Sequence, residues 1–384
     1  MIYPPQILLP GPTPVPPSVD LAMQRAMSDH RGAVFTQVKD HVTNQLEALF
    51  EVGAQGGVAV IPTTGTGALE AAIQNFFNPG DHIIGVSTGA FGERFVAVAE
   101  KMGVAVRHIR VPYGQSFDPR HIVETLEEET DIKGILVTHN ETSTGVLNPV
   151  GELARLLKTM PAHPVLIVDS ISGVPSVPLT IEKDGVDVII AASQKGFMCP
   201  PGLGILAVSA HARELILKER PGRLFFDLQP YLAGQFPYTP AVSLWNGLEE
   251  ALNLLEAEGV EPRLARHRLL SRMTRAFGAA AGMEPAVEPA IASPTVTALH
   301  VAEGFTPLDF KNQAAQLGLQ IAGGMGPWHH EMVRIGHVGA VMPNQLLEGL
   351  ATLAHLLPQG LDGVQASWNV WHEDIAVQKE AYRA

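Results

Sequence analysis

The stretch VDVIIAASQKGFMCPPGLG, residues 186–204, decides the fold. An apolar run rich in Val and Ile, Val186–Ala191, is followed by a short polar segment that contains Lys195. A proline–glycine turn and a second apolar run, Gly204–Val208, come next. Apolar runs of this length, bounded by turn residues, are typical of buried strands. The stretch therefore predicts two strands of a buried sheet, with a lysine just past the end of the first.

The same pattern extends back along the chain to about residue 57. Apolar runs alternate with amphipathic stretches of helical length, such as Ala90–Met102 and Pro119–Glu129, and Asp118 is a suitable N-cap for the second. This alternation indicates an α/β fold with a mostly parallel seven-stranded sheet flanked by helices. The expected strands are Gly57–Ile61, His82–Val86, Val104–Arg110, Gly134–Thr138, Pro164–Asp169, Val186–Ala191 and Gly204–Val208.

The chain changes character after about residue 243, which predicts a large α/β domain over 21–243 and a smaller α+β domain over 244–384. An N-terminal arm over 1–20 precedes them, and its prolines between Pro4 and Pro17 favour an extended backbone. The tail after Gly360 carries no prediction. The elements expected after residue 243 are a helical run over Leu244–Ala281 broken near Gly259 and Pro262, a strand over Thr295–Val301, and helices near Leu308–Leu317 and Asn344–Leu356.

Composition limits the classes of function. The 384 residues are 46% hydrophobic, enough for a well-buried core, but no apolar run approaches the roughly 20 residues of a membrane span. The N-terminus lacks the basic start of a secretory signal, so we expect a cytoplasmic protein. The single cysteine, Cys199, excludes an intramolecular disulfide and a multi-cysteine metal site, and no metal is predicted. The net charge of −13 argues against nucleic acid, which leaves small molecules as the expected partners.

A glycine-rich turn lies in IPTTGTGALEAAIQNFF, residues 61–77. A strand, the run Thr63 to Gly67 and a helix follow one another, so free backbone N–H groups and hydroxyls converge at a positive helix end. Such a turn is suited to a phosphate. Taken alone it is as often a plain connection between strand and helix.

Two further side chains stand at or just past the ends of predicted strands. Asp169 closes the apolar run of VLIVDSISG, residues 165–173, at the sheet edge where open α/β folds bind ligands. Its carboxylate could pair with a protonated ring nitrogen, although on its own an Asp here would more often cap the next turn. Lys195 follows a buried strand, and loss of solvent lowers a lysine pKa toward the neutral amine that forms imines. Together with the phosphate turn, the two have the order and spacing of a pyridoxal phosphate (PLP) site.

Several motifs at once resemble the class V, fold-type I PLP-dependent aminotransferases, and within them the alanine-glyoxylate or serine-glyoxylate (serine-pyruvate) group. The resemblance covers most of the chain, and the joint occurrence of the motifs makes it highly specific. The motifs are LLPGPTPVPP at 8–17, TTGTGALEAA at 63–72, FGER at 91–94, HNETSTG at 139–145, VDSISG at 168–173, SQKGFMCPPGLG at 193–204 and VRIGHVG at 333–339.

The resemblance implies a role for each matching residue. Lys195 would form the aldimine with PLP and later move the substrate proton, and Asp169 would keep the pyridine nitrogen protonated. Arg334 would clamp the substrate α-carboxylate, and Gly11 would bring backbone near the substrate. The other implied cofactor contacts are Thr64, Gly65, Thr66, Gly67 and Gln194 at the phosphate, Phe91 stacked on the ring where relatives often have Trp, and Ser143 near the ring oxygen.

The same resemblance implies a homodimer with a shared active site. Thr239, with Tyr238 beside it in PYTPAVSLW, is similar to the residue that reaches the phosphate in the neighbouring subunit, although a shift by one residue is open. The implied reaction is ping-pong transfer of the amino group from serine or alanine to a 2-oxo acid, with glyoxylate favoured as acceptor.

Other classes of function share parts of this sequence pattern. A cysteine desulfurase needs a cysteine on a loop well after the lysine, whereas Cys199 follows Lys195 by four residues. The turn TTGTG lacks the GK[ST] ending of a P-loop and the spacing of a dinucleotide site. A PLP lyase or decarboxylase, and donors that carry a phosphonate or ureido group, stay open because they would share every cofactor residue.

Overall fold

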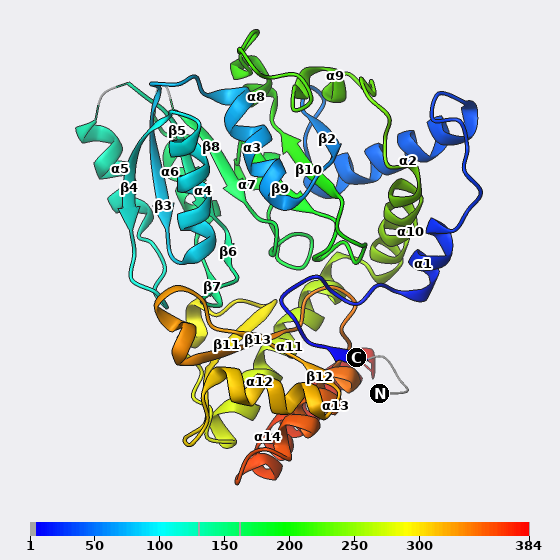
Figure 1. Cartoon of the computed structure of the whole chain (residues 1–384), viewed down its shortest axis with the longest axis vertical. Coiled ribbons are helices and arrows are strands. Elements are labelled where there is room, and N and C mark those ends of the chain that lie inside the picture. The colour runs from blue at the N-terminus through cyan, green and yellow to red at the C-terminus, as the bar shows by residue number, and fades with distance from the viewer. Residues whose placement is uncertain (1–4, 130, 161–162, 384) are drawn as a thin grey trace.

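The computed structural model describes residues 5–129, 131–160 and 163–383, with only the backbone described for 378–383. Residues 1–4 of the predicted arm, including Pro4, and Ala384 of the tail lie outside the described residues. A seven-stranded sheet forms the frame (Figure 1), and only β10 runs antiparallel to its neighbours. In spatial order its strands are β2 (Gly57–Pro62), β10 (Leu203–Val208), β9 (Val188–Ala192), β8 (Val165–Asp169), β5 (Ile132–Thr138), β3 (His82–Ser87) and β4 (Ala105–Arg110).

Helices cover both faces of this sheet because its strands present apolar side chains to both sides. In β2, Val58 and Val60 belong to one core and Ala59 and Ile61 to the other, as the two-residue period of a strand requires. The first core is closed by α2 (Ala33–Phe50), α5 (Pro119–Glu128), α6 (Val150–Leu157), α7 (Ile181–Asp184) and α10 (Val242–Glu258). The second is closed by α3 (Gly65–Phe76), α4 (Ala90–Lys101), α8 (Ala210–Leu215) and α9 (Leu228–Leu232).

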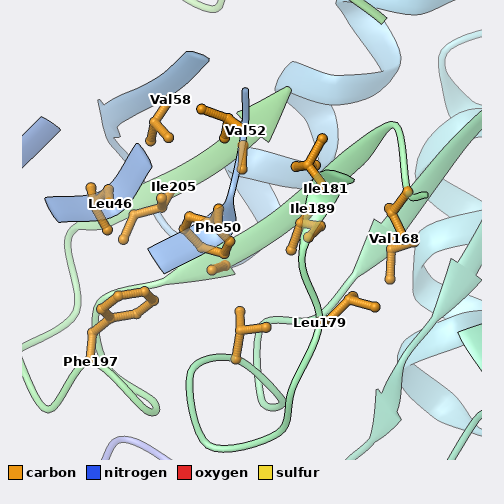
Figure 2. Packing of buried hydrophobic residues seen from close by; sticks show 14 of the residues in the cluster. Leu46, Phe50, Val52, Val58, Val168, Leu179, Ile181, Ile189, Phe197 and Ile205 are labelled. Carbon is orange, nitrogen blue, oxygen red and sulfur yellow. The ribbon is translucent and has the colours of Figure 1, made fainter. Parts of the chain in front are cut away.

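The first core anchors the loop that follows β9. Figure 2 shows Phe197 among the apolar side chains of this core, with Phe50 nearby, and the two ring centroids lie 6.4 Å apart. The hydroxyl of Ser193 donates to the carbonyl of Pro200 at 2.7 Å and closes the loop from the other side. Lys195 lies between these two fixed points, so the fold holds its backbone in place.

A smaller sheet of order β11–β14–β13 and four helices lie below the large sheet in Figure 1 and form a third core. Helices α10 and α11 are separated at Gly259, whose φ of +81° favours glycine, whereas Pro262 lies inside the first turn of α11, where proline is tolerated. The elements of this part are α11 (Val260–Ala280), β11 (Val296–His300), α12 (Pro307–Gln316), β13 (Ala322–Gly323), β14 (Met332–Gly336), α13 (Pro343–Ala354) and α14 (Gly360–Arg383).

The N-terminal segment connects the two parts. Leu8 is buried in the third core, and α1 packs beside α10. Because α10 contributes to the first core and α11 to the third, the division of the chain into domains at residue 243 stays a prediction. The remaining elements are β1 (Gln6–Ile7), which pairs with β12 (Leu319–Gln320), α1 (Pro17–Met23), β6 (Asn140–Glu141), β7 (Val146–Leu147), η1 (Pro289–Ile291) and η2 (Gly326–His330).

Most predicted elements are confirmed within one or two residues at each end, and Asp118 caps α5 by accepting a hydrogen bond from the N–H of Arg120 at 2.9 Å. The main difference at a strand start concerns β9. The sequence predicts a start at Val186, whereas β9 begins at Val188, so Asp187 lies before the strand. Its carboxylate accepts from the N–H of Leu166 and the hydroxyl of Ser209 and so ties three strands together. Within the described residues, none of the helices combines the length and the apolar character that crossing a bilayer requires.

Candidate active site

The carboxyl ends of the parallel strands surround one cavity of about 280 Å³. This sheet edge is where open α/β folds bind ligands. The residues predicted from the sequence that line it are Gly11, Thr64, Gly65, Thr66, Phe91, Asp169, Gln194 and Lys195. The wall is completed by Leu69, Arg94, Asn140, Thr142, Ile171 and Ser172. The structure therefore gathers at a single cavity residues from the N-terminal arm and from the carboxyl ends of five strands, β2, β3, β5, β8 and β9.

Lys195 projects into this cavity from the loop after β9. Burial lowers the pKa of Lys195 to about 8, and the positive charge of Arg334 acts in the same direction, while Asp169 opposes both. Its Nζ donates a hydrogen bond to the carbonyl of Pro10 at 2.6 Å. A Cβ atom on Gly11 would overlap this side chain, so only glycine leaves room for the lysine. A substantial fraction of neutral amine is thus present near pH 8.

Asp169 ends β8 and is only 5% exposed. Burial raises the pKa of Asp169 to about 7, and the hydrogen bond that Oδ1 accepts from the N–H of Ile171 at 2.9 Å acts in the opposite direction. A carboxylate here lacks solvent and gains from any cation that enters the cavity. The site is therefore suited to a ligand with a protonated nitrogen.

The N-terminus of α3 faces the cavity. Thr64 is the N-cap, and its Oγ accepts from the N–H of Gly67 at 3.2 Å, so Gly67 belongs to the turn but not to the cavity wall. Early N–H groups of a helix have no partner inside it and attract anions. Gln194 lines the cavity, and its Oε1 is buried without a partner among the described residues, so the amide has hydrogen-bonding capacity for a ligand.

Glu141 fixes the start of α4, which carries Phe91 and Arg94 on the cavity wall. The fully buried carboxylate accepts from the N–H of Gly92 at 2.9 Å and from the hydroxyl of Ser143. Burial raises the pKa of Glu141, and these hydrogen bonds oppose the rise. Ser143 also accepts from the N–H of Ala90 at 2.9 Å and lies behind the wall, not on it.

Arg334 projects from β14 and is 8% exposed. Its Nε donates to the carbonyl of Gly323 at 2.7 Å and its Nη1 to the carbonyl of Thr142 at 2.9 Å, which fixes the plane of the guanidinium. Thr142 lines the cavity, whereas Arg334 itself does not. Burial lowers the pKa of Arg334 to about 10, opposed by Glu141, so the group stays charged at neutral pH. The N–H groups that these carbonyls do not occupy can bind a carboxylate.

Two predicted residues lie away from this cavity within the chain. Thr239 lines a separate hollow with residues such as Met27, and the ring of Tyr238 stacks on Phe225 with 5.2 Å between centroids. The buried imidazole of His139 pairs through Nδ1 with the hydroxyl of Ser170 at 2.9 Å. Burial lowers the pKa of His139 to about 4, so this imidazole is neutral.

Comparison with known proteins decides the family. The protein-family model described as Aminotransferase class-V matches residues 9–330. The chain belongs to the class V aminotransferases. This aminotransferase is 33% identical over 354 residues to L-aspartate–glyoxylate aminotransferase of Paracoccus denitrificans, covering 90% of this chain and 89% of the relative. It is 35% identical over 371 residues to serine–glyoxylate aminotransferase of Hyphomicrobium methylovorum, covering 92% and 89%.

A solved structure leads to the same result. Pyridoxamine–pyruvate aminotransferase from Mesorhizobium loti superposes with a TM-score of 0.90 at 26% identity, over 97% of this chain and 98% of that one. The fold is therefore that of the fold-type I PLP aminotransferases, as the resemblance implied. In a class V aminotransferase the cofactor is pyridoxal phosphate.

The chemical groups that line the cavity of this aminotransferase fit PLP. The cavity combines a partly neutral lysine, a buried carboxylate, and a helix N-terminus whose early N–H groups face the cavity. These groups suit an aldehyde, a pyridine nitrogen and a phosphate, respectively. The desulfurase alternative lacks its nucleophile, because Cys199 is completely buried and burial raises the pKa of its thiol to about 12.

Sequence reasoning assigned no site role to Arg94 and Asn140. Arg94 stands three residues after Phe91, and its guanidinium carbon lies 5.0 Å from the Phe91 ring centroid. Its place in the FGER motif, one helical turn from the predicted stacking residue, was the available signal. The amide of Asn140 donates to the hydroxyls of Ser172 and Thr295 and so joins three segments that are distant in the sequence. No local sequence pattern predicts these contacts.

Proposed function

We propose that this aminotransferase moves the amino group of a small amino acid, serine or alanine, to glyoxylate by a ping-pong mechanism. The observation that carries the proposal is the position of the Lys195 amine, buried beside Asp169 in the cavity at the sheet edge. The names of the relatives support glyoxylate as the acceptor. The small cavity supports small substrates, because about 280 Å³ has to hold the cofactor as well.

Lys195 is the residue that moves the proton. When bound, PLP supplies a carbonyl that reacts with amines and a ring that withdraws electrons from the substrate Cα. The lowered pKa leaves part of the Nζ population neutral, so Nζ can accept the substrate α-proton and later return it. Burial of the amine keeps bulk water from competing for that proton.

Asp169 and Arg334 orient the reactants. The Asp169 carboxylate would hold a proton on the ring nitrogen, and the resulting ion pair would relieve the burial cost that raises its pKa. Arg334 would bind the α-carboxylate with the N–H groups that Gly323 and Thr142 leave free. In this arrangement Thr64, Gly65, Thr66, Gly67 and Gln194 would hold the phosphate, and Phe91 would stack on the ring.

The proposal includes a homodimer in which Tyr238 and Thr239 serve the neighbouring site. Both lie away from the cavity of their own chain, and Phe225, beside Tyr238, is 37% exposed. Met27, near Thr239, is 72% exposed, so this surface offers apolar area to a second copy. Substituting Thr239 by Ala should weaken PLP binding although Thr239 does not touch its own cavity.

Aspartate is a second candidate donor. Besides Lys195, the cavity wall contains the guanidinium of Arg94, which could bind the side-chain carboxylate of aspartate. The relative named L-aspartate–glyoxylate aminotransferase supports the same reading. Within this candidate, Arg94→Gln should raise the KM for aspartate and leave the KM for alanine unchanged.

The test is product analysis of each half-reaction. The purified holoenzyme is incubated with serine, alanine or aspartate, and the 2-oxo acid is quantified. After removal of the donor, glyoxylate is added and glycine is measured. Stoichiometric 2-oxo acid followed by glycine supports the proposal and ranks the donors. Release of ammonia or carbon dioxide without a 2-oxo acid and glycine would assign the protein to the lyases or decarboxylases.

A further inference from the structure

Arg334 lies on β14, and a tight loop over residues 324–331 connects β13 to this strand. Gly324 donates to the carbonyl of Met332 at 2.7 Å, and η2 folds the rest of the loop into one turn. The carbonyl of Gly323, the last residue of β13, accepts the Nε of Arg334. The loop therefore begins directly after one of the two carbonyls that hold the guanidinium, the other being that of Thr142.

Trp328 in this loop packs on the segment that follows β4 of the large sheet. Its ring meets Tyr113 edge to face, with 5.8 Å between centroids and 72° between planes. Two glycines make the approach possible. A Cβ on Gly114 would lie 3.0 Å from the Trp328 ring, and one on Gly326 would lie 2.5 Å from the Tyr113 hydroxyl. The aromatic pair thus joins the smaller sheet to the larger one.

Tyr113 continues this connection to the cavity wall. Its hydroxyl donates to the carboxylate of Glu93 at 3.4 Å, and Glu93 stands on α4 between the wall residues Phe91 and Arg94. Burial raises the pKa of Tyr113, and the charges of Glu93 and Glu141 raise it further, so the hydroxyl keeps its proton and remains a donor. A continuous set of contacts runs from α4 through Tyr113 and Trp328 to the carbonyl that orients Arg334.

We propose that Trp328 and Tyr113 form a clamp that positions Arg334 relative to α4 and thereby sets the affinity for the substrate carboxylate. Neither residue lines the cavity, so both are positioning residues. The inference rests on the proposed carboxylate-binding role of Arg334. Loosening the clamp moves the guanidinium while leaving in place Asp169, at the end of β8, and Lys195, in the loop after β9.

The clamp predicts a separation between KM and kcat. The α-carboxylate is bound in the ground state and in the transition state alike, and loss of such uniform binding raises KM with little change in kcat. Trp328→Ala removes the aromatic pair and should raise the KM of both the amino donor and the 2-oxo acid by about five- to tenfold. The absorbance of bound PLP and its affinity should stay unchanged.

The experiment compares Trp328→Ala with three further variants of the holoenzyme. Trp328→Phe retains an aromatic edge and should recover most of the affinity. Trp368→Ala is the matched control, because Trp368 is 44% exposed on α14 and its aromatic partner is Trp371, outside the clamp. Tyr113→Phe keeps the ring contact but removes the bond to Glu93, and it tests the clamp if Trp328→Ala fails to fold.

The outcomes separate the clamp from the proposed function. A KM increase in Trp328→Ala that Trp328→Phe reverses supports the clamp. Equal KM values for the Trp328 and Trp368 alanine variants, or a loss of PLP affinity in place of the KM increase, would overturn it. Arg334→Lys is measured in parallel: if its KM rises while that of Trp328→Ala does not, only the clamp fails. If the KM of Arg334→Lys is unchanged, the proposed carboxylate-binding role of Arg334 is wrong, and the clamp proposal fails with it.

Discussion

Lys195 donates a hydrogen bond from Nζ to the carbonyl oxygen of Pro10, 2.6 Å away, although 184 residues separate them in the chain. The N-terminal arm therefore reaches the amine that the cofactor chemistry needs. The next residue, Gly11, has a φ of +118° and no room for a side chain beside the lysine. This contact makes the arm part of the active site.

Gly11→Ala should abolish most of the activity. The new Cβ would overlap Nζ of Lys195, so either the arm or the lysine has to move, and misplacement by about 1 Å can cost on the order of 100-fold in rate. Steady-state kinetics and PLP uptake measure the effect. The control is Gly304→Ala, which has a similar φ of +89° but open space around it, and so carries the backbone cost alone. Equal activity in the two variants would contradict the contact.

Uptake of PLP by the apoenzyme should follow the titration of Lys195. Only the neutral amine attacks an aldehyde, so the rate should rise with pH and level off above a midpoint near 8. Arg334 lowers this pKa by charge repulsion, so Arg334→Gln should move the midpoint upward. Stopped-flow absorbance across a pH series gives both midpoints. A midpoint near 10.5 in the wild type would mean that Lys195 is solvated.

Asp169→Asn should separate stability from activity. In the folded apoenzyme Asp169 binds its proton up to about pH 7, whereas in the unfolded chain it ionises near pH 3.9. The folded state thus holds more protons between these values, and the wild type loses stability as pH rises through this window. At pH 8 the apo variant should be more stable by on the order of 4 kcal/mol, and at low pH the two should converge.

The same variant should lose transaminase activity by on the order of 100-fold, because a neutral amide does not hold a proton on the ring nitrogen. Chemical denaturation of the apo forms and kinetics of the holo forms provide the two measurements. An apo variant less stable than the wild type at pH 8, or one with full activity, would count against the assignment of Asp169.

Glu141→Ala should destabilise the fold. The fully buried carboxylate accepts four hydrogen bonds, among them those from the N–H groups of Phe91 and Gly92, and its removal leaves these donors without a partner. The expected loss is on the order of 3 kcal/mol in the free energy of unfolding. Glu100→Ala, on the exposed side of the same helix, is the control and should change little. Urea denaturation of both variants checks this prediction.

The sheet was predictable because buried strands leave a strong local signal. The seven runs from Gly57 to Val208 carry little charge, and each has turn residues beside it. Their charged residues are Arg107, Arg110, Asp169 and Asp187. Lys195 and Asp169 were predictable for the same reason, since Asp169 ends such a run and Lys195 follows one. A strand end is a position that sequence patterns define well.

The rest depends on contacts between distant segments. The bond from Lys195 to Pro10, the tie from Arg334 to Gly323 and the packing of Trp328 leave no local pattern. Helix α14 was not predicted, because Trp368 and other large apolar side chains of the tail are exposed and blur the helical period. The partners of these groups follow only from the folded arrangement.

The most direct test of the central assignment is an absorbance spectrum of the purified protein loaded with PLP, alongside Lys195→Ala. Donor amino acid is added first and glyoxylate second. The assignment predicts that the yellow band of the wild type bleaches with the donor and returns with glyoxylate, and that the variant completes no such cycle. A wild-type protein that takes up no PLP, or a variant that cycles like the wild type, would contradict it.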